Sequence, residues 1–413
     1  MDRLIFHIDV NSAFLSWEAV RRMADGEADI RLIPSAIGGD RDKRTGVIVA
    51  KSIPAKRFGI KTGEPVSMAL RKCPELFLAK PDFRLYEKNS RAFIAICARY
   101  APALEQFSID ECFLDMSGTD SIYPDPVRTA RQLADEIRDT LGFTVNIGIG
   151  ENKLLAKMAS DFEKPDRVHT LFLREMPEKM WPLPVSELFT VGRSTAEKLG
   201  KASIKTIGEL AESDVRVIQG LVGVKLGSQI HDFANGIDDS PVRAGREAAK
   251  GYSISTTLED DVTDAAAARN ILLALADNVA ARMRGDGKRA GCVAVTIRSN
   301  DFRDRSHQTS LHSPTDITRE IYELAVKLFD ELWDGRTPLR LLGISLTGVT
   351  DRDCVQTSLF DDGRYDRARR LDRAVDALRG KFGADIVRPA ATLDSSDRIG
   401  RKYKAQLEDK DRE

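Results

Sequence analysis

Two short stretches of the sequence place acidic side chains inside or directly after apolar runs. In residues 105–117, EQFSIDECFLDMS, the adjacent acids Asp110 and Glu111 interrupt a series of apolar residues that is typical of a β-strand. Near the N-terminus, Asp9 follows the run LIFHI at the end of another expected strand. A buried carboxylate costs several kcal/mol unless it is paired, hydrogen-bonded or bound to a metal. These three acids are therefore the candidate catalytic residues.

The chemistry that such acids support is metal-assisted phosphoryl transfer. Two or three carboxylates suffice to hold two Mg²⁺ ions roughly 3.5–4 Å apart, which clamp the attacking and leaving oxygens of a displacement. Because side chains alternate along a strand, Asp110 and Glu111 can serve one site only if they lie at a bend. Two further Asp-Glu pairs, at 135–136 and 330–331, fall in helical patterns and are interpreted as solvent-exposed helix faces.

The composition is that of a globular protein of about two to four domains. The chain has 413 residues, of which 42% are hydrophobic and 31% charged, and its net charge is −1. Any surface for nucleic acid must therefore come from a segregated basic face. No apolar run approaches the ~18 residues that span a bilayer, and acids interrupt the N-terminal run where a signal peptide is apolar, which predicts a cytoplasmic protein. Five scattered cysteines without a CxxC pattern argue against a disulfide framework or structural zinc.

The elements expected to position the acids form an α/β region. A strand over residues 3–9 precedes a helix over 11–24, which Asn11 or Ser12 caps. Further along, the strand FTVNIGIG runs directly into the helix NKLLAKMASDF. Prolines around residues 176–188 then mark a domain boundary.

Two helical segments and an α+β region follow this boundary. The turns at Gly192 and Gly223 each precede an amphipathic helix, which fits either helix-hairpin-helix units, whose amides face phosphate, or ordinary helix turns. In AGCVAVTIRSN, Val293, Val295 and Ile297 are expected to face a core while Thr296 and Arg298 face outward. The many basic side chains of residues 282–305 could contact a DNA backbone or serve solubility alone.

Taken in order, these segments resemble the Y-family translesion DNA polymerases, most closely the bacterial DNA polymerase IV group. HIDVNSAFLSWE and SIDECFLDMS resemble the two signature segments of the family, and PAKRFGIKTGEP, NIGIGENKLLAKMASDFEKP and LRLLGISLTGV follow in the expected order. The resemblance implies a multidomain α+β fold, a right hand of palm, fingers, helix-hairpin-helix thumb and α+β little finger. The implied bounds are 1–10 and 75–165 for the palm, 11–74 for the fingers, 166–236 for the thumb, 237–248 for a linker, 249–350 for the little finger and 351–413 for a tail.

The resemblance also implies roles for individual residues. Asp9 and Asp110 would bind two Mg²⁺ ions, with the Val10 carbonyl as an additional ligand. Glu111 would complete the shell of the ion that activates the primer 3′-hydroxyl. Phe14 would be the steric gate that excludes a ribose 2′-hydroxyl, although from its own surroundings it is interpreted as a core residue of an amphipathic helix.

The residues expected to bind the triphosphate differ in part from the pattern of the family. Lys157 matches the lysine that reaches the triphosphate. The run Tyr-x-Ala-Arg of the fingers is replaced by Ile53-Pro54-Ala55-Lys56, so Lys56 keeps the charge without the bidentate fork of arginine. Lys51 or Arg57 could compensate.

Contacts with DNA and with a partner protein are expected outside the cavity. In the tail, QTSLF resembles a peptide that binds the sliding clamp (beta subunit), with Gln356, Leu359 and Phe360 as its anchors. The basic helix after this peptide, residues 364–383, has no assigned role. The residues expected to contact the DNA backbone are Gly192, Gly223 and Arg298.

These observations predict a DNA-directed DNA polymerase for error-prone translesion synthesis. It would use two Mg²⁺ ions to transfer nucleotides from dNTPs to a primer 3′-hydroxyl, act as a monomer on primer-template DNA with the sliding clamp, and need no membrane. The alternative is a DNA- and clamp-binding scaffold that is weak or inactive because of its altered fingers. A palm-fold nucleotide cyclase shares the two-metal chemistry but needs neither thumb nor clamp peptide.

Overall fold

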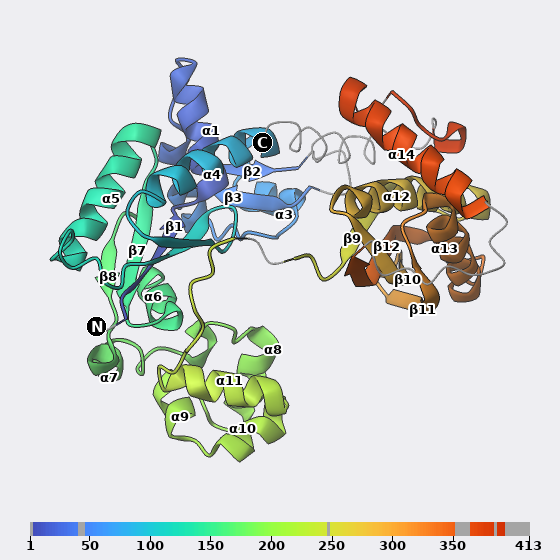
Figure 1. Ribbon diagram of the computed structural model, residues 1–413. Coiled ribbons are helices and arrows are strands. Elements are labelled where there is room, and N and C mark those ends of the chain that lie inside the picture. The colour runs from blue at the N-terminus through green and yellow to red at the C-terminus, as the bar shows by residue number, and fades with distance from the viewer. Residues whose placement is uncertain (1–2, 40–45, 246–247, 352–363, 384–385, 393–413) are drawn as a thin grey trace. The chain divides into compact units, whose positions relative to one another are not determined.

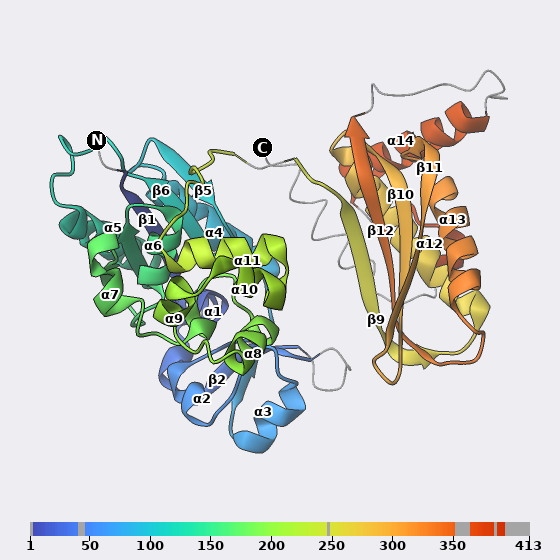
Figure 2. The same cartoon turned by 90° about the horizontal axis from the view of Figure 1, so that it is seen from below.

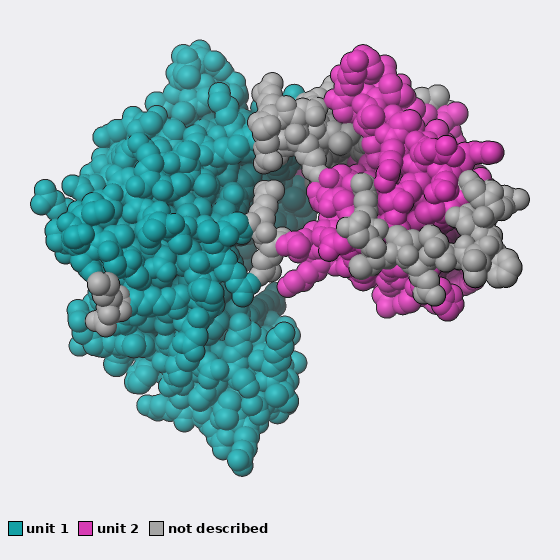
Figure 3. Space-filling model, viewed as in Figure 1, with its two compact units in different colours: residues 1–39, 47–246 teal, residues 40–46, 247–413 magenta. Residues whose placement is uncertain are grey.

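A computed structural model describes residues 3–39, 46–245, 248–351, 364–383 and 386–392 (Figure 1). The chain divides into two compact units, residues 1–39 with 47–246 and residues 40–46 with 247–413 (Figure 3). The main boundary, between residues 246 and 247, lies within the segment predicted as a linker. In the described parts of the chain, no helix is long and apolar enough to cross a membrane.

The described residues of unit 1 contain a five-stranded sheet with β1 at its centre (Figure 1). β1 is antiparallel to both of its neighbours, and their registers place Asp9 opposite Glu111 on one side and opposite Asn146 on the other. The order along the sheet is β5 (Ala103–Gln106), β6 (Glu111–Asp115), β1 (Ile5–Val10), β7 (Val145–Gly150) and β8 (Val168–Thr170).

The two faces of this sheet are covered by different helices. Phe6, Ile8 and Val10 belong to the core that also contains buried residues of three helices. The opposite face of β1 carries His7 and Asp9 and is covered by a fourth helix. The three helices are α1 (Ala13–Ala24), α4 (Phe83–Cys97) and α5 (Pro126–Leu141), and the fourth is α6 (Lys153–Ser160).

Two glycines of β7 allow α6 to pack unusually close to the sheet. A Cβ on Gly148 would lie 2.0 Å from the Ala156 carbonyl oxygen and 2.4 Å from the Ser160 nitrogen. Gly150 is similarly crowded by Leu155 and Ala156. The sequence NIGIG therefore brings the last turn of α6 directly beneath β1.

A smaller three-stranded sheet with a separate core lies between α1 and α4 in the sequence. Its strands and helices are β2 (Ser35–Gly38), β3 (Ile48–Lys51), β4 (Phe77–Ala79), α2 (Ile53–Arg57) and α3 (Val66–Lys72), with the short turn η1 (Ile30–Leu32) before them. β4 pairs with β2 because Leu76 and Leu78 pack into this core, although the predicted palm begins at residue 75. Similarly, β8 joins the large sheet although the predicted thumb begins at residue 166.

A helical segment completes unit 1, and it shares one hydrophobic core with apolar residues of α6. Gly223 ends one helix and begins the next with φ = 95°, and Gly192 precedes another helix. The elements are η2 (Leu173–Glu175), α7 (Met176–Lys179), η3 (Val185–Glu187), α8 (Arg193–Lys201), α9 (Ile207–Glu212), α10 (Val215–Val222) and α11 (Val224–Ala234).

Unit 2 is an antiparallel sheet with two long helices against it (Figure 2). The strand order is β11 (Asp304–Thr315), β10 (Lys288–Ser299), β12 (Leu339–Asp351) and β9 (Tyr252–Val262), and the helices are α12 (Ala265–Gly285) and α13 (Thr318–Leu332). Val293, Val295 and Ile297 are buried while Thr296 and Arg298 are only partly buried, so the predicted alternation of β10 is confirmed.

The basic helix of the tail, α14 (Arg364–Phe382), packs against α12, and the short turn η4 (Ala390–Thr392) follows it. Arg284 of α12 lies 2.6 Å from Asp376 and 3.3 Å from Asp372, and Arg379 lies 2.7 Å from Asp277 of α12. Arg284 and Arg289 are buried, so these two members of the basic stretch 282–305 do not face solvent. The basic surface expected from the sequence is smaller for this reason.

Candidate active site

Asp110 and Glu111 lie at a bend between β5 and β6, as the sequence predicts. The N–H groups of Phe107 and Ser108 both donate to the Glu111 carbonyl, at 3.0 and 3.1 Å, and close a tight turn. Beyond this turn Glu111 begins β6 opposite Asp9, and the Val10 N–H donates to the Asp110 carbonyl at 3.0 Å. Acids from two distant segments are therefore brought together at adjoining strand ends.

Asp9 and Asp110 both line a cavity of about 390 Å³. One wall is the turn from β1 into α1, the second is formed by β3 and α2, and the third is the segment after α6. Residues of the first wall are Val10, Asn11, Ser12, Ala13 and Phe14; those of the second include Lys51, Ile53 and Lys56; Lys164 and Pro165 form the third. The cavity thus joins acids on its floor to cations on two of its walls.

Phe14 lines this cavity and is held by other aromatic rings. Its ring stacks on that of Tyr86, with centroids 4.5 Å apart and planes 15° apart, and Trp17 and Phe83 contact it at larger angles. Tyr86 and Trp17 are fully buried. The ring therefore has a fixed position at the cavity wall while belonging to the edge of the core.

The N-terminus of α1 faces the same cavity. Ser12 adopts the left-handed conformation, with φ = 48° and ψ = 49°, which turns the chain from β1 into the helix. Asn11 connects this turn to the residue before β7. Its side-chain amide donates to the Thr144 hydroxyl at 3.1 Å, and its backbone N–H donates to the Thr144 carbonyl at 3.0 Å. Free N–H groups at the start of a helix favour an anion, which suits this wall to phosphate.

The structure places two lysines against the acids, and sequence reasoning named only one of them. The Lys157 ammonium lies 3.2 Å from Glu111 Oε1, and Lys157 is not among the residues that line the cavity. Lys164 does line the cavity, and its ammonium contacts Asp9. The only sequence signal for Lys164 was its place in the segment SDFEKP, directly after α6.

The three ionisable groups of the floor respond differently to burial. Burial raises the pKa of Glu111, but the His7 ring, whose Nε2 lies 3.5 Å from the carboxylate, and the Lys157 ammonium outweigh it and lower that pKa to about 2. Burial raises the pKa of Asp9 even though Lys164 opposes it. Burial likewise lowers the pKa of His7, whose Nδ1 lies 2.8 Å from the Ser160 hydroxyl. Lys164 therefore compensates the Asp9 carboxylate incompletely, as expected of a group that takes a further cation.

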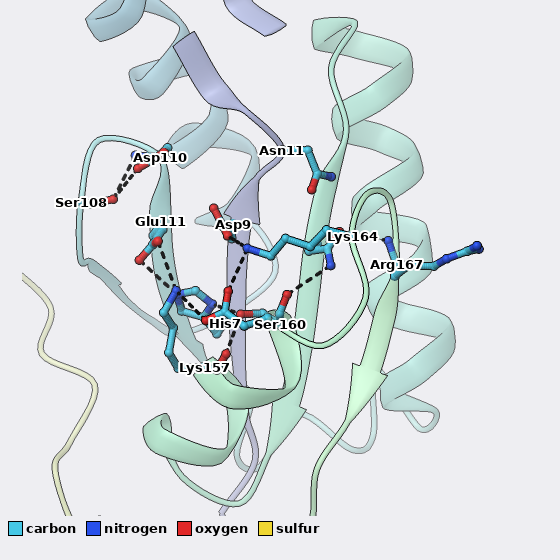
Figure 4. A network of polar contacts seen from close by, with 12 residues as sticks. His7, Asp9, Asn11, Ser108, Asp110, Glu111, Lys157, Ser160, Lys164 and Arg167 are labelled. Atoms are coloured by element: carbon cyan, nitrogen blue, oxygen red, sulfur yellow. Dashed lines mark hydrogen bonds and ion pairs between the residues drawn. The ribbon is translucent and has the colours of Figure 1, made fainter. Parts of the chain in front are cut away.

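The oxygen atoms of Asp9, Asp110 and Glu111 are of the kind that binds a divalent cation such as Mg²⁺, although each of these carboxylates contacts another side chain in this structure. In the described ranges, no three His, Cys, Asp or Glu side chains are placed to hold one metal ion. Asp9 contacts Lys164, Glu111 contacts Lys157, and Asp110 accepts a hydrogen bond from the Ser108 hydroxyl at 2.6 Å (Figure 4). Carboxylate and carbonyl oxygens are the ligands that Mg²⁺ prefers. Binding would require Lys164 to leave Asp9 and Asp110 to turn from Ser108.

The second wall carries the altered residues of the fingers. Lys51 donates to the Thr62 hydroxyl at 3.1 Å, and burial together with the nearby Lys56 lowers its pKa. Ile53 lines the cavity with an apolar side chain, and Arg57 is not among the lining residues. Of the two candidates for a compensating cation, Lys51 is the one that the structure places at the cavity.

The remaining predicted contacts lie outside the cavity. Gly192 and Gly223 each precede a helix of the predicted thumb, in line with the expected turns. Arg298 forms an ion pair with Asp304 across the β10–β11 pair, with Nε 2.5 Å from Oδ1. The predicted clamp peptide, residues 356–360, lies outside the described residues.

Comparison with known sequences and structures agrees with this geometry. The sequence model of the impB/mucB/samB family matches residues 8–161, that of the impB/mucB/samB family C-terminal domain matches residues 249–359, and a model described as DNA polymerase-iota, thumb domain, matches residues 186–238. The fold resembles that of a Y-family DNA polymerase chimera with a TM-score of 0.73 at 19% identity, over 84% of this chain and 99% of that one.

Similar curated proteins share nearly the full length of the chain. A protein named DNA polymerase IV from Clostridium acetobutylicum is 43% identical over 399 residues, covering 96% of this chain and all of that protein. DNA polymerase IV 1 of Bacillus subtilis is 36% identical over 395 residues, covering 95% of this chain and 93% of that protein. The chain therefore belongs to the DNA polymerase IV group of the Y-family DNA polymerases.

Proposed function

We propose that the chain extends a DNA primer along a template by transferring nucleotides from dNTPs to the primer 3′-hydroxyl, as an error-prone translesion enzyme. The class of DNA-directed DNA polymerase follows from its family. The observation that carries the proposal is that Asp9, Asp110 and Glu111 meet at adjoining strand ends, two of them inside a cavity that cations also line. Such a cavity suits a substrate that carries a triphosphate.

The carboxylates would hold two Mg²⁺ ions, which neutralise charge on the phosphates and activate the 3′-hydroxyl. Asp9 and Asp110 line the cavity and would contact both ions, with the Val10 carbonyl on the same strand end. The neighbouring His7 and Lys157 lower the pKa of Glu111, so Glu111 is ionised and needs no deprotonation before it accepts a cation. Most of the rate enhancement would come from positioning and charge neutralisation.

The triphosphate would be bound by the other two walls. The residues at the start of α1 and the two lysines Lys51 and Lys56 line the cavity. Lys164 is better placed than Lys157 to contact a phosphate, because Lys164 lines the cavity and Lys157 lies beneath Glu111. A larger rise of the KM for dNTP in Lys157→Ala than in Lys164→Ala would instead favour Lys157 as the lysine that contacts the triphosphate.

Phe14 would exclude ribonucleotides because its ring is fixed at the cavity wall by Tyr86. A fixed ring cannot move aside for a 2′-hydroxyl without disturbing Trp17 and the core around it. Phe14→Ala should therefore incorporate ribonucleotides more readily, and unchanged discrimination would remove the gate role.

Contacts with larger partners stay predictions. Gly192, Gly223 and Arg298 would contact the backbone of primer-template DNA in a salt-sensitive, sequence-independent manner. Gln356, Leu359 and Phe360 would anchor the sliding clamp to a monomeric, cytoplasmic enzyme. Deleting residues 356–360 should abolish stimulation by the clamp and leave unstimulated synthesis unchanged.

Primer extension with Asp110→Ala is the central test. Activity should fall by about three orders of magnitude, since a ligand of both ions is lost, while the melting temperature stays near that of the wild type. Asp135→Ala is the matched control, because Asp135 also precedes a glutamate but lies on the exposed face of α5 and pairs with Arg138. Undiminished activity of Asp110→Ala would contradict the metal assignment, and a wild type that binds primed DNA without extending it would indicate the scaffold.

A further inference from the structure

Asp161, which no part of the proposed reaction uses, stands between the two lysines that hold the catalytic acids. Its Oδ2 lies 3.4 Å from Lys157 Nζ and its Oδ1 lies 2.8 Å from Lys164 Nζ. Lys157 also contacts Glu111, and Lys164 also contacts Asp9. Acid and base therefore alternate along five side chains, Glu111, Lys157, Asp161, Lys164 and Asp9, which we term the acid–lysine series.

The series is anchored by the close packing of α6 on the sheet. Asp161 is the C-cap of this helix, four residues after Lys157, a spacing at which side chains on one helical face meet, and Lys164 lies three residues further on in the segment that follows the helix. Because Gly148 and Gly150 let α6 lie against β7, Lys157 and the end of α6 are held beneath β1.

The two lysines differ in their freedom to move. The Lys157 side chain is only 10% exposed, whereas that of Lys164 is 36% exposed and that of Asp161 is 46% exposed. Lys157 is therefore a fixed counter-charge for Glu111. Lys164 can exchange partners, and in the described part of the chain its acidic partners are Asp9 and Asp161.

We infer that Asp161 is a positioning residue that holds Lys164 when Asp9 releases it, and so frees the Asp9 carboxylate for a divalent cation. The inference rests on the proposed function. Without the charge of Asp161, the Lys164 ammonium would have Asp9 as its remaining acidic partner among the described residues, and it would compete with the cation there.

The charge of Asp161 gives this role a signature that a structural role lacks. Replacing Asp161 by Asn makes the surroundings of Lys157 and Lys164 more positive by one unit. A more positive site binds a cation less tightly and a triphosphate at least as tightly. The apparent affinity for Mg²⁺ should therefore fall while that for dNTP stays the same or rises, whereas damage to the fold would weaken both.

The test compares Asp161→Asn with Glu163→Gln in the full chain. Glu163 is two residues further on, and its carboxylate lies 3.7 Å from Arg167, outside the acid–lysine series. Calorimetric titration of Mg²⁺ into the protein without DNA or nucleotide should give a half-saturating concentration about three- to tenfold higher for Asp161→Asn, and within about twofold of the wild type for Glu163→Gln. In primer extension at saturating Mg²⁺, the KM for dNTP of Asp161→Asn should be unchanged or lower.

A double-mutant cycle with Lys164→Met shows whether the effect acts through Lys164. If Asp161 acts by holding that ammonium, Asp161→Asn should change Mg²⁺ binding by less than about twofold in the Lys164→Met background, whereas independent effects would simply add. Unchanged Mg²⁺ binding in Asp161→Asn, a parallel loss of both affinities, or full additivity would overturn the inference. A wild type that extends no primer would contradict the proposed function instead, and the Mg²⁺ titrations would still decide the role of Asp161.

Discussion

Two of the clusters of ion pairs in the described residues, one in each unit, differ in the burial of their cations, and this difference separates their roles. In unit 2, Arg284 and Arg379 are only 4% and 3% exposed, and both bridge α12 and α14. In unit 1, Lys164 and Asp161 are partly exposed, and their contacts hold a carboxylate that the proposed reaction needs. Separating a buried ion pair costs several kcal/mol, because water does not replace the lost partner, whereas separating a solvent-exposed pair costs about 1 kcal/mol or less. The first cluster therefore fixes the fold, and the second can exchange partners.

The largest effect of breaking an ion pair is expected at Arg284. Arg284→Met would leave Asp372 and Asp376 at the contact with α12 without their arginine, and removing one partner of a buried pair typically costs about 3–5 kcal/mol. Amide hydrogen exchange across α14 should accelerate accordingly. Lys164→Met, at the partly exposed cluster, should change the free energy of unfolding by less than about 1 kcal/mol.

Arg282→Met is the matched control for this comparison. Arg282 lies on the same helix but donates to the Ser253 carbonyl, away from the aspartates of α14. Equal acceleration of exchange across α14 in Arg282→Met and Arg284→Met would show that the ion pairs do not hold this helix. A large loss of stability in Lys164→Met would remove the distinction between the two clusters.

A smaller effect is expected from pH, with opposite signs for two acids of one site. The pKa of Glu111 is lowered from 4.5 to about 2, so its ionised form stabilises the folded state above pH 4.5, and this stability is lost as the pH falls from about 4.5 to 2. The shift corresponds to about 3 kcal/mol. The pKa of Asp9 is raised by burial, so its ionised form destabilises the metal-free protein, and protonation relieves this as the pH falls.

Denaturant unfolding between pH 2 and 7 in the presence of a chelator measures both contributions. Glu111→Gln should be less stable than the wild type at pH 7, and the difference should vanish near pH 2. Asp9→Asn should be more stable than the wild type at pH 7 and should lose this advantage in acid. A metal-free protein in which both substitutions act in the same direction would contradict the assigned electrostatics.

What the sequence predicted, and what it missed, follows from the same physics. Periodicity and burial were enough to place Asp110 and Glu111 at a bend and to orient β10, because both arguments need only neighbouring residues. The contact of Lys164 with Asp9 could not be predicted, because a residue in a connecting segment belongs to no periodic pattern that indicates which residues it contacts. The positions of the acids could therefore be predicted from the sequence, whereas the position of Lys164 could not.

The contact of α14 with α12 was missed for a different reason. A helix with many charges is normally interpreted as solvent-exposed, and the sequence RYDRARRLDRAVDALRGKF contains charges on every side. Asp372, Asp376 and Arg379 nevertheless share one helical face, and this polar face is the one that contacts α12. Leu371 and Phe382 are exposed instead. A rule that buries apolar faces could not predict this orientation.

The smallest effect is expected at the exposed pair of Arg298 and Asp304. Arg298 makes two hydrogen bonds to this carboxylate, at 2.5 and 2.8 Å, and Asp304 thereby neutralises a charge that the sequence assigns to the DNA backbone. Asp304→Asn should leave the melting temperature unchanged and raise the affinity for duplex DNA about two- to threefold at low salt, with the difference shrinking as salt increases.

Asp301→Asn separates a local effect of Arg298 from one of overall charge. Asp301 lies in the turn between β10 and β11 and pairs with Arg303 at 3.0 Å, so its replacement changes the net charge equally and leaves the pair of Arg298 with Asp304 intact. Fluorescence anisotropy with a primed duplex should therefore show a larger gain for Asp304→Asn than for Asp301→Asn. Equal gains would mean that DNA responds to the charge of this turn as a whole, and Arg298 would lose its assignment as a backbone contact.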